Sequence, residues 1–255
     1  MVRTIDLNSD MGESFGRWQL GNDADLMGVI TSANIACGWH GGDPAVMRTT
    51  VELAAEKGVG IGAHVGLPDL LGFGRRRMQV TPDGIYDYTM YQSGALRAFA
   101  EAAGSRLQHV KPHGAFYTMS AADEALAAAL VRAVEALGDG VVLYGMGEIE
   151  PALAERAGVG YVREGYVDLN YDDSGGLVIE RNKGAWDPEE VARRAVRLAT
   201  RNEVGTVEGN TLPLAVESIC IHGDAPNSGE VTRRVRQRLE EAGIGIAPVR
   251  PLSAV

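Results

Sequence analysis

The chain has 255 residues, which would suffice for two ordinary domains, although α/β barrels commonly use about this length for one. Its formal net charge is −10 and it contains no run rich in lysine and arginine, which argues against a nucleic-acid partner. No apolar stretch approaches the ~20 residues of a membrane span, and the N-terminus lacks signal-peptide features, so we expect a cytoplasmic protein without membrane contact.

The first apolar run, residues 2–7, leads into a cluster of acidic and amide side chains. Asp6, Asn8 and Asp10 alternate along the chain, and at the period of a strand they point to one side. An Asx-rich turn after a strand would explain a single pair of this kind. Because similar polar clusters follow later apolar runs, we favour a shared site.

Apolar runs and helical spacing alternate along the rest of the chain. Further strands are expected at 31–36, 59–63, 108–111, 141–144, 159–163 and 214–221, and helices at 22–30, from 44, from 82, after 123, at 147–157, from 188 and from 227. Asp43-Pro44, Thr81-Pro82 and Asp187-Pro188 each have the form of a helix N-terminus. Ser120 and Asp123 are predicted to form a capping pair.

The segment 165–186 is longer than an ordinary connection between a strand and a helix. Ser174-Gly175-Gly176, between alternating apolar residues, predicts a small hairpin there. We expect this segment to serve as a lid.

The repeated order of strand, polar turn and helix predicts a parallel sheet closed into a seven-stranded α/β barrel, with residues 1–255 forming a single domain. In such barrels the active site lies at the carboxyl ends of the strands. The polar residues expected at that end are Asp10, His40, His64, His113, Asp168 and Asp224.

Four of the five histidines follow a strand end in a turn that contains glycine, an arrangement that is unusual for solvated surface histidines. His109 is the exception, and we interpret it as structural. Lys111 is interpreted either as a group that binds an anion or supports a carboxylate, or as a solvated lysine at a strand end. Cys37 and Cys220 each lie in an apolar run, which predicts buried thiols without a disulfide.

The motifs of known chemistries narrow the possible reactions. Aspartate together with histidines could hold Zn, Mn or Ni, but no His-x-x-x-His spacing fixes such a site, so the sequence leaves a divalent metal open. The chain has neither a P-loop nor a dinucleotide-binding glycine motif, so nucleotide chemistry would need another chain. No nucleophile elbow is present. Hydrolysis by an activated water, with carboxylate and imidazole as base and acid, remains.

Several longer motifs resemble one known family. They are Asp6-Leu7-Asn8-x-Asp10-x-Gly12-Glu13, Ser32-Ala33-Asn34-Ile35-Ala36-Cys37-Gly38-x-His40, Gly62-Ala63-His64, His109-Val110-Lys111-Pro112-His113-Gly114 and Cys220-Ile221-His222-Gly223-Asp224. From about Ile5 to Gly243 the chain resembles the LamB/YcsF family, to which the A subunit of ATP-dependent 5-oxoprolinase belongs. The resemblance implies a seven-stranded barrel like that of the polysaccharide deacetylases. It also implies a complex with B and C subunits that converts 5-oxo-L-proline, ATP and water to L-glutamate, ADP and phosphate.

The resemblance also suggests roles for the clustered residues. Asp10 and His113 are expected to act as acid and base, in an order that spacing does not settle, and His64 completes the catalytic group. Substrate binding is expected to involve Asn8, Asn34, His40, Lys111, Asp168 and Asp224. ATP would be a co-substrate bound mainly by the partner subunits. A stand-alone metal-dependent deacetylase or amidohydrolase and a non-catalytic binding barrel are the alternatives.

The chain departs from the family pattern after the sixth strand. The family usually has an arginine after the aspartate, whereas here Asp168 is followed by Leu169. Loss of that arginine would remove a charge-assisted bond to a substrate carboxylate. We interpret the change either as different packing of the lid, or as a changed substrate preference or a replacement by Arg181 or Lys183.

Overall fold

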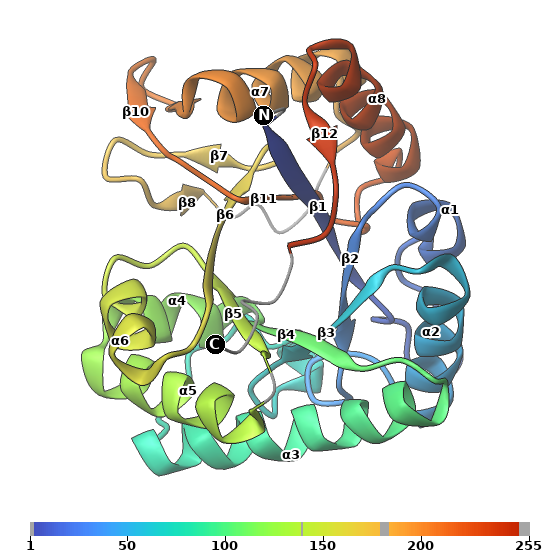
Figure 1. The fold of residues 1–255 in the computed structure, drawn as a ribbon, viewed down its shortest axis with the longest axis vertical. Helices are drawn as coiled ribbons and strands as arrows, with labels where there is room; N and C mark the ends of the chain where they lie inside the picture. Colours follow the sequence, from blue (N-terminus) through green and yellow to red (C-terminus); the bar gives the residue numbers. More distant parts are fainter. Residues whose placement is uncertain (1–2, 139, 179–183, 250–255) are drawn as a thin grey trace. The chain divides into compact units, whose positions relative to one another are not determined.

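The computed structural model describes residues 3–138, 140–178 and 184–249, and Figure 1 traces the fold. The elements, in chain order, are β1 (Thr4–Met11), α1 (Asp23–Met27), β2 (Ser32–Ala36), α2 (Pro44–Lys57), β3 (Gly60–Val65), the 3₁₀ turn η1 (Leu70–Gly72), α3 (Pro82–Ala102), β4 (Leu107–Pro112), α4 (Gly114–Ala122), α5 (Glu124–Leu137), β5 (Val142–Gly145), α6 (Glu150–Ala157), β6 (Tyr161–Tyr166), β7 (Asn170–Tyr171), β8 (Leu177–Val178), α7 (Pro188–Arg201), β9 (Glu203–Gly205), β10 (Thr211–Pro213), β11 (Ser218–Cys220), α8 (Ser228–Glu241) and β12 (Gly245–Ile246).

The main sheet has a closed strand order. Among the described residues the order is β11-β6-β5-β4-β3-β2-β1-β12, and β11 also pairs with β1. Seven strands therefore close on themselves, with β12 added beside β1, and the pairs β1–β11, β11–β6, β3–β4 and β4–β5 are parallel. The predicted seven-stranded α/β barrel is confirmed.

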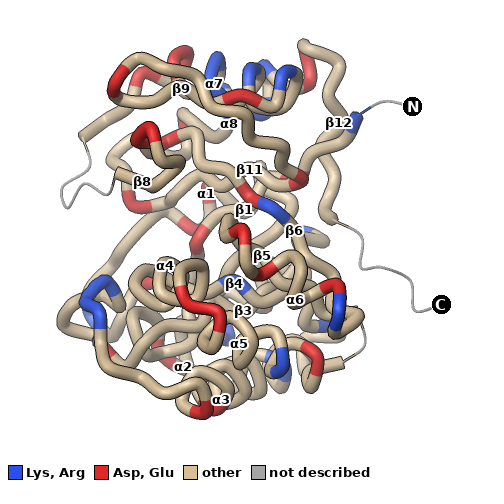
Figure 2. The backbone as a smooth tube through the Cα atoms, turned by 90° about the vertical axis from the view of Figure 1, so that its left-hand side faces the viewer, with Lys and Arg blue, Asp and Glu red and all other residues tan. Residues whose placement is uncertain are grey.

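The chain divides into two compact units. Unit 1 comprises the described parts of Met1–Ser9, Gly21–Ser32 and Arg163–Val249. In it, Asp6 and Asn8 of β1 pair with Ser218 and Cys220 of β11. Helices α7 and α8 pack side by side in this unit (Figure 1). Acidic and basic residues are interspersed along α7 (Figure 2), while Val191, Ala195 and Leu198 of that helix are buried.

Unit 2 comprises the described parts of Asp10–Leu20 and Ala33–Val162. Its strands β3 and β4 place His64 beside Lys111, and β4 and β5 place His109 beside Val142. Helices α3 and α5 pack together in this unit (Figure 1). On α5, Leu126, Leu130, Val134 and Leu137 repeat at helical spacing, which predicts an apolar face, and all four are buried.

The local rules for helix starts and turns predicted the structure well. Asp43 accepts hydrogen bonds from Ala45 N and Val46 N, and Thr81 and Asp187 cap α3 and α7 in the same way. The predicted hairpin is formed by β7 and β8, in which Asn170 pairs with Val178. Cys37 and Cys220 are buried free thiols, and burial raises the pKa of Cys37 to about 12.

Three strands extend two or more residues beyond the predicted ends. β1 runs to Met11, β3 to Val65 and β6 to Tyr166, so that Asp10, His64 and Glu164 lie inside strands rather than after them. These side chains are buried, at 8% exposure or less. A polar side chain indicates the end of a strand when its hydrogen bonds must be made to water. Here the hydrogen-bonding groups of these side chains are paired with other buried groups, so the strands continue past them.

The predicted capping pair is wrong. Ser120 lies within α4, a helix that the sequence analysis missed, and its Oγ donates to Tyr117 O. Asp123 alone caps α5, by accepting from Ala125 N and Leu126 N. Helices α4 and α5 meet at Asp123. Because Asp123 was interpreted as part of the start of α5, the end of α4 was not recognised.

Smaller corrections concern short elements and one helix face. The last predicted strand is limited to Ser218–Cys220, and the two- and three-residue strands β9, β10 and β12 were too short to show a period. On α3, the spacing of Ile85, Tyr88, Gln92, Leu96 and Phe99 predicts one buried face, but Tyr88 and Phe99 are only half-buried, and Thr89 and Ala100 lie in the core instead. Helix α1 is shorter than expected, at Asp23–Met27.

No helix among the described residues is both long and apolar enough to cross a membrane. The single domain and the lid role of 165–186 stay predictions.

Candidate active site

Asp10 is the centre of a buried ion pair in unit 2. Its Oδ1 accepts from Lys111 Nζ of β4 at 3.0 Å and from Asn34 Nδ2 of β2 at 2.8 Å. The side chains of Asp10 and Lys111 are 7% and 2% exposed, so water contributes little to their solvation. Buried ion pairs of this kind need additional hydrogen bonds, which Asn34 supplies here. Both donors bind Oδ1, while Oδ2 lies 3.4 Å from His64 Nε2.

His109 orients the amide that binds Asp10. Its Nε2 lies 2.7 Å from Asn34 Oδ1, and its ring stacks on Tyr144 at 4.3 Å. Burial, followed by the charge of Lys111, lowers the pKa of His109 to about 3, so the ring is neutral. Because Asn34 Oδ1 can only accept, we place the proton on Nε2, in the shorter of the two ring contacts; Nδ1 lies 3.2 Å from Gln108 Oε1. A Cβ at position 62 would lie 1.9 Å from His109 Nε2, which explains the need for Gly62. This arrangement supports a structural role for His109.

Three imidazole rings and one carboxylate form a second group beside Asp10, which we call the histidine cluster: Glu13, His40, His64 and His113. The rings of His40 and His113 stack at 3.7 Å and 5°, and the His64 ring is nearly perpendicular to both. Glu13 Oε1 lies 3.3 Å from His40 Nε2 and 3.7 Å from His113 Nδ1. His113 Nδ1 lies 2.9 Å from His64 Nε2.

Backbone carbonyls fix the tautomers of two rings in the histidine cluster. His64 Nδ1 lies 2.9 Å from Lys111 O, and His113 Nε2 lies 2.8 Å from Phe73 O. A carbonyl only accepts, so both of these nitrogens carry the proton in a neutral ring. The opposite nitrogens, His64 Nε2 and His113 Nδ1, are then both acceptors, although they face each other.

Burial favours the neutral form of two rings of the histidine cluster, His40 and His113. It is the largest cause of the lowered pKa of His40 and of His113, both well below the ordinary value of 6.5, and neighbouring histidines lower both further. Neutral imidazole is the form that binds metals. The ligand atoms of the four cluster residues lie within 4.8 Å of one another, so they could hold a metal ion.

The loop after β3 contributes to the histidine cluster through its backbone. Phe73 adopts a left-handed conformation and presents its carbonyl to His113. At Gly74, with φ of +62°, a Cβ would lie 2.8 Å from both His113 Cδ2 and His40 Cβ. Asp69 anchors this loop by accepting from Gly72 N and from the Arg76 guanidinium.

Six of the nine predicted site residues come together in unit 2: Asp10, Asn34, His40, His64, Lys111 and His113. The other three, Asn8, Asp168 and Asp224, belong to unit 1. Asn8 Nδ2 donates to Ser218 Oγ at 2.7 Å and to Glu164 Oε2 at 3.3 Å. Asp224 lines a surface hollow together with Asn22 and Asn227.

Asp168 forms a compact pair with His222. It accepts from His222 N at 2.9 Å and lies 3.0 Å from His222 Nδ1, and Tyr166 stacks on the imidazole at 5.5 Å. The exposed fractions of the two side chains are 2% for Asp168 and 17% for His222. Both carboxylate oxygens of Asp168 therefore face a donor of His222.

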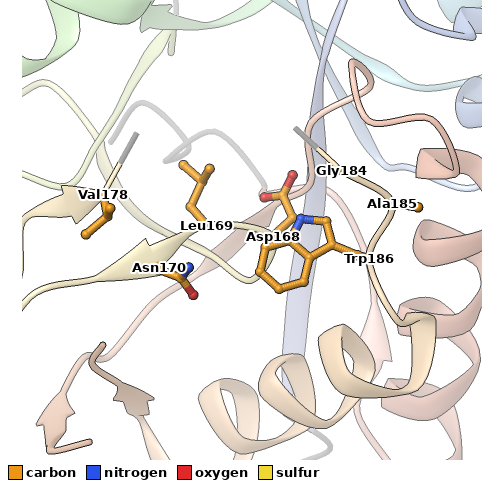
Figure 3. A pocket seen from close by; sticks show the side chains of 7 residues that line it. All are labelled: Asp168, Leu169, Asn170, Val178, Gly184, Ala185 and Trp186. Carbon is orange, nitrogen blue, oxygen red and sulfur yellow. The ribbon is translucent and has the colours of Figure 1, made fainter. Parts of the chain in front are cut away.

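Leu169 lines a pocket of about 200 Å³ in unit 1, next to Asp168, Asn170 and Trp186 (Figure 3). A cation is present nearby: Arg194 stacks over Trp186 at 4.9 Å and donates to Asn170 Oδ1 at 3.2 Å. Its Nε also donates to Glu190, so part of its charge is already compensated. The proposed replacements Arg181 and Lys183 lie outside the described residues.

The sequence analysis gave no role to Glu13 or His222, although both stand in the motifs that were singled out. Glu13 was overlooked because the first strand was expected to end at Leu7, six residues before it. At its true end, Met11, Glu13 lies just past the strand. Because active sites of such barrels lie at the carboxyl ends of the strands, this position makes Glu13 a candidate site residue.

Comparison with known proteins establishes the relationship. The model of the LamB/YcsF family matches residues 5–254. The chain belongs to the LamB/YcsF family. A relative from Pyrococcus abyssi, named as the A subunit of 5-oxoprolinase, is 46% identical over 249 residues, which cover 96% of this chain and 98% of the relative.

Two solved structures have a similar fold. A lactam utilization protein from Thermus thermophilus is 41% identical, with a TM-score of 0.88, and the match covers 96% of this chain and all of that one. A polysaccharide deacetylase from Bacillus cereus matches with a TM-score of 0.52 at 13% identity, covering 99% and 94% of the two chains. The second match shows the fold alone, and it confirms the predicted likeness to the deacetylase barrels.

Proposed function

We propose that this LamB/YcsF member is the A subunit of an ATP-dependent 5-oxoprolinase and opens the lactam of 5-oxo-L-proline to L-glutamate. Relatives that match over nearly their whole length are named as the A subunit of 5-oxoprolinase, and a solved relative is named a lactam utilization protein. ATP would serve as co-substrate, bound mainly by partner subunits B and C. The cytoplasmic location stays a prediction.

The observation that carries the chemical part of the proposal is the position of Asp10 between Lys111, Asn34 and His64. A lactam is an unstrained amide, so its hydrolysis needs an activated carbonyl, a base for the attacking water and a proton for the departing nitrogen. Coupling to ATP would activate the carbonyl oxygen as a phosphate. The buried carboxylate and imidazoles would supply the proton transfers.

The roles within the site follow from these contacts. Lys111 and Asn34 hold Asp10 through Oδ1 and stabilise its negative charge, so that Oδ2 is the oxygen that exchanges a proton. The pair His64–His113 forms the other half of the catalytic group. We propose His40 and the unit 1 residues Asn8, Asp168 and Asp224 as substrate-binding groups.

A reconstitution assay tests this function. The purified chain is mixed with B and C subunits, 5-oxoproline and ATP, and glutamate and phosphate are both measured. We expect both products only in the complete mixture, and no ATP hydrolysis by this chain alone. ATP turnover by a clean preparation of the single chain would contradict the division of labour.

A second candidate is a stand-alone metal-dependent amidohydrolase or deacetylase, favoured by one observation, the histidine cluster. It predicts lactam or acetamide hydrolysis by the chain alone after loading with a divalent metal, without ATP. Glutamate that forms only in the presence of ATP would reject this candidate.

A further inference from the structure

The contact between His64 and His113 is chemically incomplete. Both tautomers are fixed by backbone carbonyls, so two lone pairs face each other across 2.9 Å. Asp10 Oδ2, at 3.4 Å from His64 Nε2, and Glu13 Oε1, at 3.7 Å from His113 Nδ1, also accept hydrogen bonds when ionised. The ligand atoms of His64, His113 and Glu13 lie within 4.8 Å of one another, with Asp10 Oδ2 beside His64. Electron-rich atoms thus meet at one point in a site shielded from water, where their repulsion is little screened.

A positive charge at that point would resolve the repulsion. One solution is a proton shared by the two rings, which would leave the site unable to bind a metal ion. The other is a divalent ion, which neutral imidazole and carboxylate bind well. Ligands on adjacent positions of a metal with bonds of about 2.0–2.2 Å lie roughly 3 Å apart, close to the separations seen here.

We propose that the histidine cluster binds one divalent first-row transition-metal ion, with His64 Nε2, His113 Nδ1 and Glu13 Oε1 as ligands. Asp10 Oδ2, 3.4 Å from His64 Nε2, lies next to this set. Such an ion supplies Lewis acidity when it is bound. The metal site stands on the contacts of unit 2 and does not depend on the proposed function. With the ion bound, His64 and His113 would be its ligands and would not transfer protons through the same nitrogens.

His40 is assigned a different role because of its geometry. Its ring is parallel to that of His113 and 3.7 Å away, so the lone pairs of the two rings run side by side and do not converge on one ion. His40 Nε2 lies 3.3 Å from Glu13 Oε1, to which it can donate. Buried His40 Nδ1 has no hydrogen-bond partner among the described residues, as expected when the proton resides on Nε2. His40 is therefore a positioning residue for Glu13.

Metal binding to the purified chain tests the proposal directly. The protein is stripped with a chelator and dialysed, then titrated with Co²⁺, whose visible absorption reports nitrogen and oxygen ligation, and Zn²⁺ is added as competitor. We expect one Co²⁺ per chain, displaced by Zn²⁺. Glu13→Gln, whose side chain is the most exposed of the cluster, should weaken Co²⁺ binding at least as much as the ~10–100-fold loss typical of changes around a metal site.

Two further variants make the outcome decisive. The double variant His64→Asn/His113→Asn should lose the Co²⁺ spectrum, and His222→Asn, which removes a histidine paired with a carboxylate outside the cluster, should keep it. Circular dichroism verifies folding, and Glu13→Gln serves if the double variant does not fold. Failure of the wild-type chain to bind Co²⁺ or Zn²⁺, or full binding by Glu13→Gln, would overturn the proposal, and a shared proton would then remain. Because the readout needs neither lactam nor ATP, it can fail or succeed independently of the proposed reaction.

Discussion

The histidine cluster of unit 2 and the Asp168–His222 pair of unit 1 contain the same residue types with opposite hydrogen-bond balance. In the pair, the carboxylate of Asp168 accepts from a backbone N–H and a ring nitrogen of His222. In the cluster, acceptors of His64 and His113 face each other. A balanced pair is satisfied without a ligand, whereas the unbalanced cluster is stabilised by something that binds. The excess of hydrogen-bond acceptors over donors, more than the residue types present, identifies the candidate active site.

The largest expected difference between the two regions is in turnover. His113→Ala should lower the rate of glutamate formation in the reconstituted complex by on the order of 10²–10⁴, since it removes a group in direct contact with the catalytic centre. The matched variant His222→Ala should change the maximal rate less than about tenfold and act mainly on the apparent affinity for the lactam. Steady-state kinetics of both variants checks this, and a larger loss of maximal rate in His222→Ala would reverse the assignment.

The buried ion pair should matter more to stability than an ion pair at the surface. Lys111→Met leaves the carboxylate of Asp10 buried without its ammonium partner, and we expect a loss of about 3–5 kcal/mol in the free energy of unfolding. The exposed pair Arg48–Glu52 on α2 is the control, and Arg48→Gln should cost about 0.3–0.5 kcal/mol. Denaturant unfolding measures both losses of unfolding free energy. Equal losses would show that burial does not determine how much an ion pair contributes to stability.

Two glycines with similar left-handed backbone conformations allow the cost of backbone strain to be compared with the cost of steric crowding. Gly58→Ala, at a helix end with nothing near the new Cβ, should cost about 1 kcal/mol of strain. Gly74→Ala adds contact with His113 and His40 to a similar φ, so we expect a loss nearer to 3 kcal/mol together with reduced Co²⁺ binding. Thermal unfolding with a metal titration distinguishes them, and indistinguishable variants would contradict the tight packing of the cluster.

The smallest expected effect is on the acid limb of stability. The hydrogen bond from Arg76 is the largest cause of the lowered pKa of Asp69, which lies below the ordinary value of 3.8. A carboxyl group with a lowered folded pKa contributes stability above its unfolded pKa and loses it as the pH falls through the folded one. Asp69→Asn should therefore flatten the decline in stability below about pH 4. Unfolding midpoints from pH 7 to pH 2 check this, and an unchanged slope would argue against it.

Local rules predicted more of the fold than of the site. Asp43, Thr81 and Asp187 were recognised as caps because a cap bonds to the next two or three residues. The partners of Asp10 are distant in sequence: Lys111 lies 101 residues away. Reasoning from neighbouring residues does not reveal hydrogen bonds to partners so distant in sequence. For this reason the first strand was predicted to end too early, and Glu13 was given no role. The convergence of histidines was still predictable, because barrel strands bring their carboxyl ends together.

The most direct test of the account is the rate of glutamate formation by the reconstituted complex containing Asp10→Asn, an isosteric change that keeps the contacts to Lys111 and Asn34 possible. Asp168→Asn is the matched control in unit 1, and circular dichroism verifies that both fold. We predict that Asp10→Asn lowers the maximal rate by on the order of 10²–10⁴, while Asp168→Asn mainly raises the concentration of 5-oxoproline needed for half-maximal rate. A near-normal maximal rate in a folded Asp10→Asn complex would contradict the assignment of the active site.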